Sequence, residues 1–175
     1  MFKPFVAFVL WAVVLNGLAT ACSDVPVKSS QGTTSQEDLV ANATTTLQAD
    51  AIVSEILTLT NQERKTNGLS PLTLNPKLNQ AAQKHAENMA KQGIMSHELD
   101  GRSMRERVED ENYKWTSLAE NVAMGYPTPK AVVTGWMKSP GHRTNILSRN
   151  TQIGIGYATS AAGELYWCQV FGIGK

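Results

Sequence analysis

The spacing of apolar residues changes along this chain, from a helical repeat in its first half to strand-like runs near its C-terminal end. In segment 51–66 the apolar residues recur with the period of a helix, and Asp50 can cap the start of that helix. Two runs rich in β-branched and aromatic residues, 152–159 and 164–171, are joined by a connection that contains Gly163. Helices that precede antiparallel strands predict an α+β fold rather than an alternating α/β fold.

Capping residues mark the other predicted helices. Asn75 and Pro76 open a second helix, which Gly93 ends and whose apolar face includes His85. Pro129 lies in the first turn of a third helix. Further helical turns are predicted near 103–108 and at 142–147, and the rest of 94–126 is predicted to be irregular.

The run 164–171 carries large side chains on both of its faces, including Trp167 and Phe171. A strand that is covered on both sides predicts a sheet lying between two layers of helices. Gly154 and Gly156 lie in the other strand-like run, where glycine permits two backbones to approach closely.

Residues 1–21 are predicted to be a signal peptide that does not belong to the fold. Lys3 supplies a positive charge, and an almost unbroken apolar stretch follows at 5–15. This stretch is shorter than the roughly 20 apolar residues of a membrane span. The small residues at 19–21 satisfy the pattern for signal cleavage.

Cys22 follows this cleavage pattern and resembles the lipidated cysteine of a bacterial lipoprotein, although the usual leucine three places earlier is Ala19. We therefore expect Cys22 to carry lipid and to attach the protein to a membrane. The alternative is a secreted protein whose mature N-terminus is a cysteine. If Cys22 is lipidated, Cys168 has no intrachain disulfide partner.

The composition suits one folded domain behind a polar segment. Residues 22–49 are rich in Ser, Thr, Gln, Asn and Ala and predict a flexible tether, which leaves 50–175 as the domain. The 175 residues are 42% hydrophobic and 18% charged, an ordinary globular balance. The formal net charge of +1 argues against a nucleic-acid partner, because such proteins usually carry a basic excess.

Candidate chemistry rests on the three histidines and one carboxylate. His85 lies on an apolar helix face, where a packed ring is expected, whereas His97 and His142 lie in predicted loop or turn positions. Glu120 has apolar neighbours in the chain and therefore needs a polar partner. Spacing alone does not show that these groups meet.

Several of these segments together resemble a known family. They are NQER at 61–64, GLSPL at 68–72, MSH at 95–97, AENV at 119–122, GWMKSPGHRTNIL at 135–147, IGIG at 153–156 and YWCQVFG at 166–172. Over about residues 52–172 the chain resembles the bacterial branch of the CAP superfamily. These SCP-like domains are related to cysteine-rich secretory proteins, antigen 5 and plant pathogenesis-related protein 1.

The resemblance implies a three-layer α-β-α sandwich with a central, mainly antiparallel sheet. It also implies a cleft where His97, Glu120 and His142 converge and can bind Zn²⁺ or another divalent cation. Glu120 would be either the third ligand or the partner that orients one of the histidines. A second acidic residue of the eukaryotic pattern would fall near Ser139, so serine there removes one ligand. We expect Asn121, beside the cleft, to be structural and to hold a turn after Glu120.

The resemblance defines the fold better than the function. We expect a non-enzymatic binding module, exported and anchored at the outer membrane or surface, or otherwise periplasmic or secreted. Its cleft would take a cation and a small or lipid-like ligand or a peptide, and no residue is assigned as catalytic. Two alternatives stay open, a zinc-dependent hydrolase or peptidase and a structural or adhesive envelope module.

Overall fold

The computed structural model describes residues 36–175. The predicted signal peptide, Cys22 and the first part of the predicted tether lie outside the described residues. The elements, in chain order, are α1 (Gln36–Thr66), β1 (Thr73–Leu74), α2 (Pro76–Gln92), α3 (Met104–Asp110), β2 (Trp115–Met124), α4 (Pro129–Lys138), α5 (Pro140–Ile146), β3 (Gln152–Thr159) and β4 (Leu165–Gly174).

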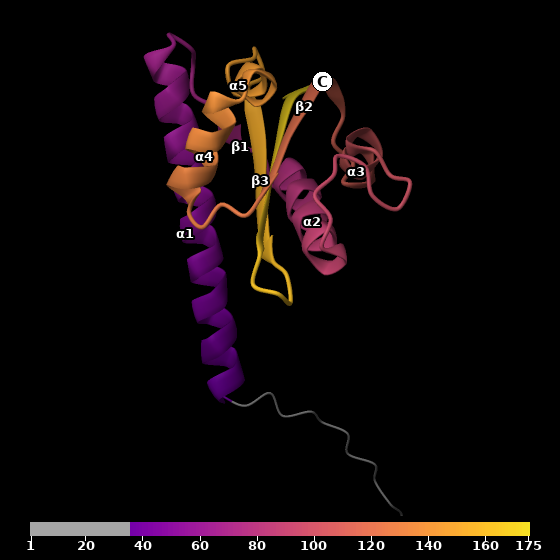
Figure 1. The fold of residues 1–175 in the computed structure, drawn as a ribbon. Helices are drawn as coiled ribbons and strands as arrows, with labels where there is room; N and C mark the ends of the chain where they lie inside the picture. Colours follow the sequence, from indigo (N-terminus) through magenta and orange to yellow (C-terminus); the bar gives the residue numbers. More distant parts are fainter. Residues whose placement is uncertain (1–35) are drawn as a thin grey trace, which may run out of the picture. The chain divides into compact units, whose positions relative to one another are not determined.

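The strands form one sheet in the order β1-β3-β4-β2. β4 pairs antiparallel with β3 on one side and with β2 on the other, and the short β1 runs parallel to β3. Helix α2 covers one face of the sheet, and α1 and α4 cover the other (Figure 1). The α+β class and the three-layer sandwich expected from the sequence are both confirmed.

Alternation along β4 fills both layers of the core. Tyr166, Cys168 and Val170 pack into the cluster that includes α2, whereas Trp167 and Phe171 pack into the cluster that includes α4. All five residues are at most 2% exposed. The large residues on both faces of this strand therefore mark a central strand, as the sequence predicted.

Glycines allow α2 to lie directly on β3. A Cβ built at Gly154 would overlap the backbone of Leu78, and one at Gly156 would overlap the backbone of Ala82. Because β1 pairs with β3 at only two positions, side chains of α2 bond the remainder of that strand edge. Asn79 Oδ1 accepts from the Ile155 N–H at 2.8 Å, and Gln83 bonds both backbone groups of Tyr157.

Two predictions of secondary structure were wrong. α1 begins at Gln36 rather than at Ala51, so residues 36–49, which we expected in the tether, are helical. Their lack of an apolar stripe indicates exposure rather than absence of a helix, since Val40 and Leu47 are 61% and 70% exposed. Residues 115–124, expected to be irregular, form the strand β2. Within the described residues no helix is long and apolar enough to cross a bilayer.

Candidate active cleft

His97 lies in the loop that connects α2 to α3, and α2 itself positions this loop. The helix ends at Gly93, which adopts the left-handed conformation with φ 68°. His85, fully buried on α2, then binds the carbonyl of Ser96 through Nε2 at 2.8 Å. The buried helix residue predicted to be structural therefore fixes the segment that presents His97.

Glu120 is the carboxylate that His97 meets. His97 Nδ1 lies 2.8 Å from Glu120 Oε1, so the imidazole donates through Nδ1 and leaves Nε2 free. Glu120 is in β2, and strand alternation places it with Val122 on the α2 side of the sheet. The carboxylate is buried, with 6% of the residue exposed, and it has the partner that the sequence argument required.

Arg107 is the functional residue that sequence reasoning missed. It lies on α3, and its guanidinium donates to Glu120 Oε2 at 2.6 Å and to the carbonyls of His97 and Arg102 at 3.0 Å each. The sequence of α3 could have pointed to Arg107, because this residue lies three positions after Met104 and directly before Val108, both of which face the core. A basic residue beside a buried helix face is a natural partner for a carboxylate in an apolar segment.

These contacts set the charges of the cluster. Burial by itself would raise the pKa of Glu120, but the hydrogen bond from His97 and the charge of Arg107 outweigh it and lower that pKa. The same hydrogen bond raises the pKa of His97, against the opposing effect of burial. Burial, then the charge of Glu120, raises the pKa of the Cys168 thiol, whose Sγ lies 3.6 Å from Glu120 Oε2.

The His97–Glu120 pair should make stability depend on pH. A raised His97 pKa contributes stability that is complete below the unfolded value of 6.5 and is lost as pH rises through the folded value. The lowered Glu120 pKa contributes stability above 4.5 that is lost as pH falls through its folded value. We expect His97→Ala to cost more free energy of unfolding at about pH 5.5 than at about pH 8.5.

Urea denaturation in the presence of a chelator measures this difference without interference from metal. The matched control is Glu98→Gln, the next residue in the same loop, whose effect should vary little between the two pH values. An equal loss of stability for His97→Ala at both pH values would contradict the assignment of the pair.

His142 lies in α5, where its turn was predicted. The Asn121 side chain donates to the His142 carbonyl at 3.2 Å, and Asn145 donates to Asn121 Oδ1 at 2.9 Å and to the Glu120 carbonyl at 3.0 Å. Asn121 is therefore structural, but it joins α5 to a strand and does not hold a turn. Ser139 lies at the junction of α4 and α5 and makes no capping hydrogen bond with its side chain.

The three predicted cleft residues are brought together unequally. His97 and Glu120 are in direct contact. His142 is near His97, because the pKa of His142 is lowered first by burial and then by the charge of His97. The His142 ring makes no hydrogen bond within the described part of the chain. Among residues 36–175 no three His, Cys, Asp or Glu side chains are arranged to hold a metal ion. Both Glu120 oxygens are engaged, one by His97 and the other by Arg107.

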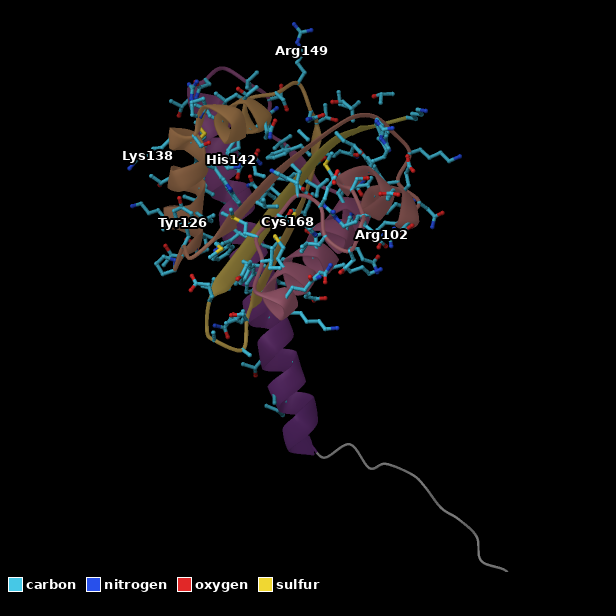
Figure 2. The ribbon with its side chains drawn as sticks, turned by 45° about the vertical axis from the view of Figure 1, so that its right-hand side comes forward. Arg102, Tyr126, Lys138, His142, Arg149 and Cys168 are labelled. Carbon is cyan, nitrogen blue, oxygen red and sulfur yellow. The ribbon has the colours of Figure 1, made fainter. Side chains whose placement is uncertain are left out.

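A cleft of about 660 Å³ opens beside His97 and Glu120. Figure 2 shows His142 on the α5 side and Arg102 on the α3 side of the molecule, with Cys168 between them in the view. The other residues that line the cleft are Glu98, Ser103, Met104, Arg105 and Glu106.

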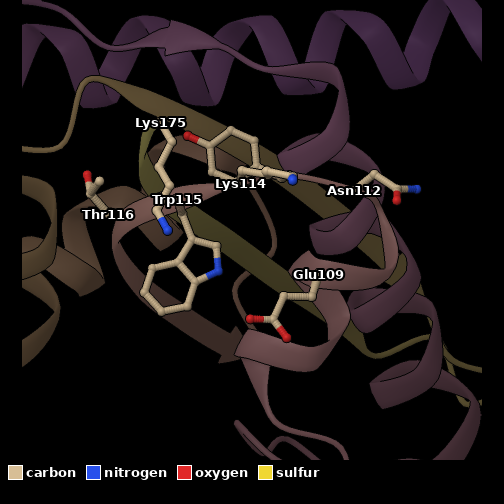
Figure 3. Close-up of a pocket in the computed structure, with 7 residues that line it drawn as sticks. Glu109, Asn112, Lys114, Trp115, Thr116 and Lys175 are labelled. Atoms are coloured by element: carbon tan, nitrogen blue, oxygen red, sulfur yellow. The ribbon is translucent and has the colours of Figure 1, made fainter.

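A separate hollow of about 570 Å³ lies at the start of β2 (Figure 3). Trp115 lines it together with Lys114 and Glu109. The guanidinium of Arg105 lies 5.2 Å from the centre of the Trp115 ring. This hollow contains none of the residues that the sequence singled out.

Comparison with known families identifies the domain. The model of the cysteine-rich secretory protein family, CAP, matches residues 57–171. The chain belongs to the CAP family. This match covers every element from the last third of α1 to most of β4, and it includes all the cleft residues.

Relatives of this CAP domain occur in longer bacterial proteins. The chain is 35% identical over 154 residues to YkwD, an uncharacterized protein of Bacillus subtilis, covering 84% of this chain and 58% of that protein. It is 33% identical over 104 residues to YlbC, an uncharacterized membrane protein of the same organism, covering 58% and 30% respectively. The chain thus spans about half or less of the length of these curated relatives.

Solved CAP structures share the fold. An outer surface protein of Borrelia burgdorferi is 23% identical with a TM-score of 0.63, covering 72% of this chain and 92% of that one. An extracellular SCP-domain protein of Bacillus anthracis is 22% identical with a TM-score of 0.64, covering 81% and 45%. Contrary to what the family name suggests, this chain has only two cysteines, and Cys168 is a free buried thiol.

Proposed function

We propose that this CAP domain is an exported binding module of the bacterial envelope, and that His97 and His142 together hold a divalent cation, most naturally Zn²⁺. The observation that carries the proposal is the 2.8 Å contact between His97 Nδ1 and Glu120. A carboxylate that holds one ring nitrogen fixes the tautomer and leaves the other nitrogen to a metal, as in many zinc sites.

The donor chemistry supports two imidazole ligands and no direct carboxylate ligand. Glu120 gives one oxygen to His97 and the other to Arg107, so it acts as the partner that orients His97. Burial lowers the pKa of His142, which favours the neutral ring that metal binding requires. A bound cation would supply an open coordination position for a ligand, because two protein ligands leave Zn²⁺ unsaturated.

The surroundings of the cleft favour an amphipathic ligand. Ile94 and Met95, just before His97, are 50% and 45% exposed. Met104 contributes an apolar side chain to a lining that is otherwise mostly charged. A small or lipid-like molecule, or a peptide, with one polar end would place that end at the cation and its apolar part on these side chains.

Calorimetric titration with Zn²⁺ at about pH 7.5, where most histidines are neutral, tests the cation site. His97→Ala and His142→Ala should each weaken binding at least about tenfold, because each removes one of two ligands. His85→Gln is the matched control, since it removes the remaining histidine while keeping a donor toward Ser96. Equal affinity in the wild type and both alanine variants would contradict the proposal.

The hydrolase alternative has less support from the residues around the cleft. Cys168 is fully buried with a raised pKa, so its thiol stays protonated and closed to a substrate. Ser96 is engaged in a local turn, donating to the Glu98 carbonyl at 2.7 Å and accepting from the Glu98 N–H. Peptide or ester turnover that disappears in His142→Ala would favour the hydrolase.

Export and lipid attachment through Cys22 belong to the same proposal. The apolar segment before Cys22 and the extracellular or membrane character stated for several relatives support it. Cells grown with a palmitate analogue should label the wild-type protein and leave Cys22→Ala unlabelled. Absence of label on the wild type, or label that survives in the variant, would show that the protein is not anchored at this cysteine.

A further inference from the structure

The strand β2 forms one edge of the sheet, so only one of its sides pairs with another strand. Alternate residues of such a strand direct both their N–H and C=O groups away from the neighbouring strand. The Glu120 carbonyl accepts from the Asn145 side chain at 3.0 Å, and the Val122 carbonyl accepts from the Trp136 indole at 3.4 Å. Neither donor belongs to a strand, so Glu120 and Val122 face outward from the sheet.

Leu118 is the next residue in this alternation, and its main-chain groups on the outer side are unpaired. Within residues 36–175 the outward N–H and C=O of Leu118 and the N–H of Glu120 have no hydrogen-bond partner. The first five residues of the strand, 115–119, are exposed or half-buried, whereas 120–123 are buried. Helices α4 and α5 therefore occupy the outer carbonyls in the second half of this edge, and the first half keeps its free groups.

Unpaired main-chain groups at the edge of a sheet are complementary to a further strand. An extended peptide that lies along such an edge supplies the matching C=O and N–H groups. A bulge between Trp115 and Ser117 interrupts the regular pairing of β2 just before Leu118. The added strand would therefore be short and centred on Leu118.

The charges at the start of β2 favour an acidic peptide. Lys114 and Lys175 line the hollow beside Trp115 (Figure 3). The guanidinium of Arg105 lies over the Trp115 ring. These three cations form no ion pair with any residue of the described part of the chain. Among the described residues that line the hollow, Glu109 is the one carboxylate, so the positive charges exceed the negative ones.

The free edge and the cations are within reach of one short peptide. Lys114 lies four residues before Leu118, which is about 13 Å along an extended strand. We infer that the edge of β2 binds an extended acidic peptide, whose main chain pairs with Leu118 and whose carboxylate lies at Lys114 and Lys175. A second copy of this chain fits less well, because it would bring the same cations to the edge. The inference goes beyond the proposed cation site, since it uses neither His97 nor His142.

Binding of a synthetic peptide in the presence of a chelator, followed by fluorescence anisotropy, tests the inference. The probe is dye-labelled acetyl-Asp-Asp-Val-Thr-Val-Thr-Asp-Asp-amide, whose centre favours a strand and whose acidic ends allow pairing in either direction. We expect saturable binding that weakens as the salt concentration rises. The same peptide with N-methyl groups on its four central residues keeps its charge but loses its main-chain donors, and it should bind at least about tenfold more weakly.

Hydrogen exchange of the ¹⁵N-labelled protein shows whether the edge is open. The N–H of Leu118 should exchange rapidly in the free protein, whereas the N–H of Ala119, which faces β4, should be protected. The acidic peptide should slow exchange at Leu118 at least about tenfold and leave Ala119 unchanged.

Variants of the protein separate the two contributions. Lys114→Glu combined with Lys175→Glu should weaken the acidic peptide at least about tenfold, because it reverses two charges at the hollow. The matched control is Lys130→Glu combined with Lys138→Glu on α4, which should bind within about twofold of the wild type. Leu118→Pro removes the outward N–H without removing a bond to β4 and should also weaken binding. If Leu118→Pro does not fold, the N-methylated peptide still measures the main-chain contribution.

Three outcomes would overturn the inference. One is the absence of binding by the acidic peptide. Another is equal binding of the N-methylated peptide, which would show contact through charge alone. The third is a Leu118 N–H that is already protected in the free protein, and a concentration-dependent dimer in sedimentation would then assign the edge to a second copy. The test contains a chelator, so its failure leaves the proposed cation site untouched.

Discussion

Replacing Arg107 by methionine is expected to lower the free energy of unfolding by about 3–5 kcal/mol, which is typical when a buried ion pair loses one partner. Methionine fills much of the same volume, so the loss is mainly electrostatic. Glu120 would remain buried at 6% exposure, with only His97 to balance its charge. Arg107 also bonds the His97 carbonyl, so the loop that presents the imidazole should loosen as well.

Two further variants show whether the loss comes from the buried charge. Adding Glu120→Gln to Arg107→Met removes the unpaired carboxylate and should recover part of the lost stability. Arg105→Met changes an exposed arginine of the same helix, whose guanidinium lies over Trp115, and should cost about 1 kcal/mol or less. A loss in Arg107→Met no larger than that in Arg105→Met would show that the ion pair is not important for stability.

Replacing Gly154 by alanine is expected to destabilise the fold by about 3 kcal/mol or more, beyond the usual effect of one added methyl group in a core. The added Cβ would overlap the backbone of Leu78 and Asn79, which cannot rotate away as a side chain can. α2 would have to move off the sheet, and the bond from the Ile155 N–H to Asn79 would be strained or lost.

Gly141→Ala is the matched control for this prediction. Gly141 lies in α5, and a Cβ built there meets no atom within 4 Å. Alanine should therefore be neutral or slightly stabilising, by up to about 1 kcal/mol, because it favours the helix. Thermal or urea denaturation of the two variants gives the comparison, and equal stability of both would contradict the close approach of α2 to β3.

The predictable parts of the fold are those with strong local signals. α2 begins and ends where Asn75, Pro76 and Gly93 indicated, and β3 has the predicted bounds. The strand β2 was missed because Trp115–Met124 shows no alternation of apolar and polar residues. Its residues 120–123 are buried on both faces of the strand, and two of them, Glu120 and Asn121, are polar. Only its pairing with β4 makes it a strand, and such a long-range pairing is not written in the local sequence.

The site was predictable as a set of residues but not as a set of bonds. The need of Glu120 for a partner was evident from its apolar neighbours, yet the sequence could not tell that Arg107 takes one oxygen and His97 the other. That choice depends on how α3 packs against β2. The contacts favour the second of the two roles expected for Glu120, the partner that orients an imidazole rather than a metal ligand.

The most direct test of the central claim is a zinc X-ray absorption spectrum of the protein loaded with one equivalent of Zn²⁺. Two imidazole ligands in the wild type, with the remaining positions filled by oxygen, are predicted, because His97 Nε2 and the ring nitrogens of His142 have no hydrogen-bond partner within the described residues. One imidazole should disappear in His97→Ala and one in His142→Ala. A spectrum without imidazole scattering, or one that neither substitution changes, would contradict the shared cation site.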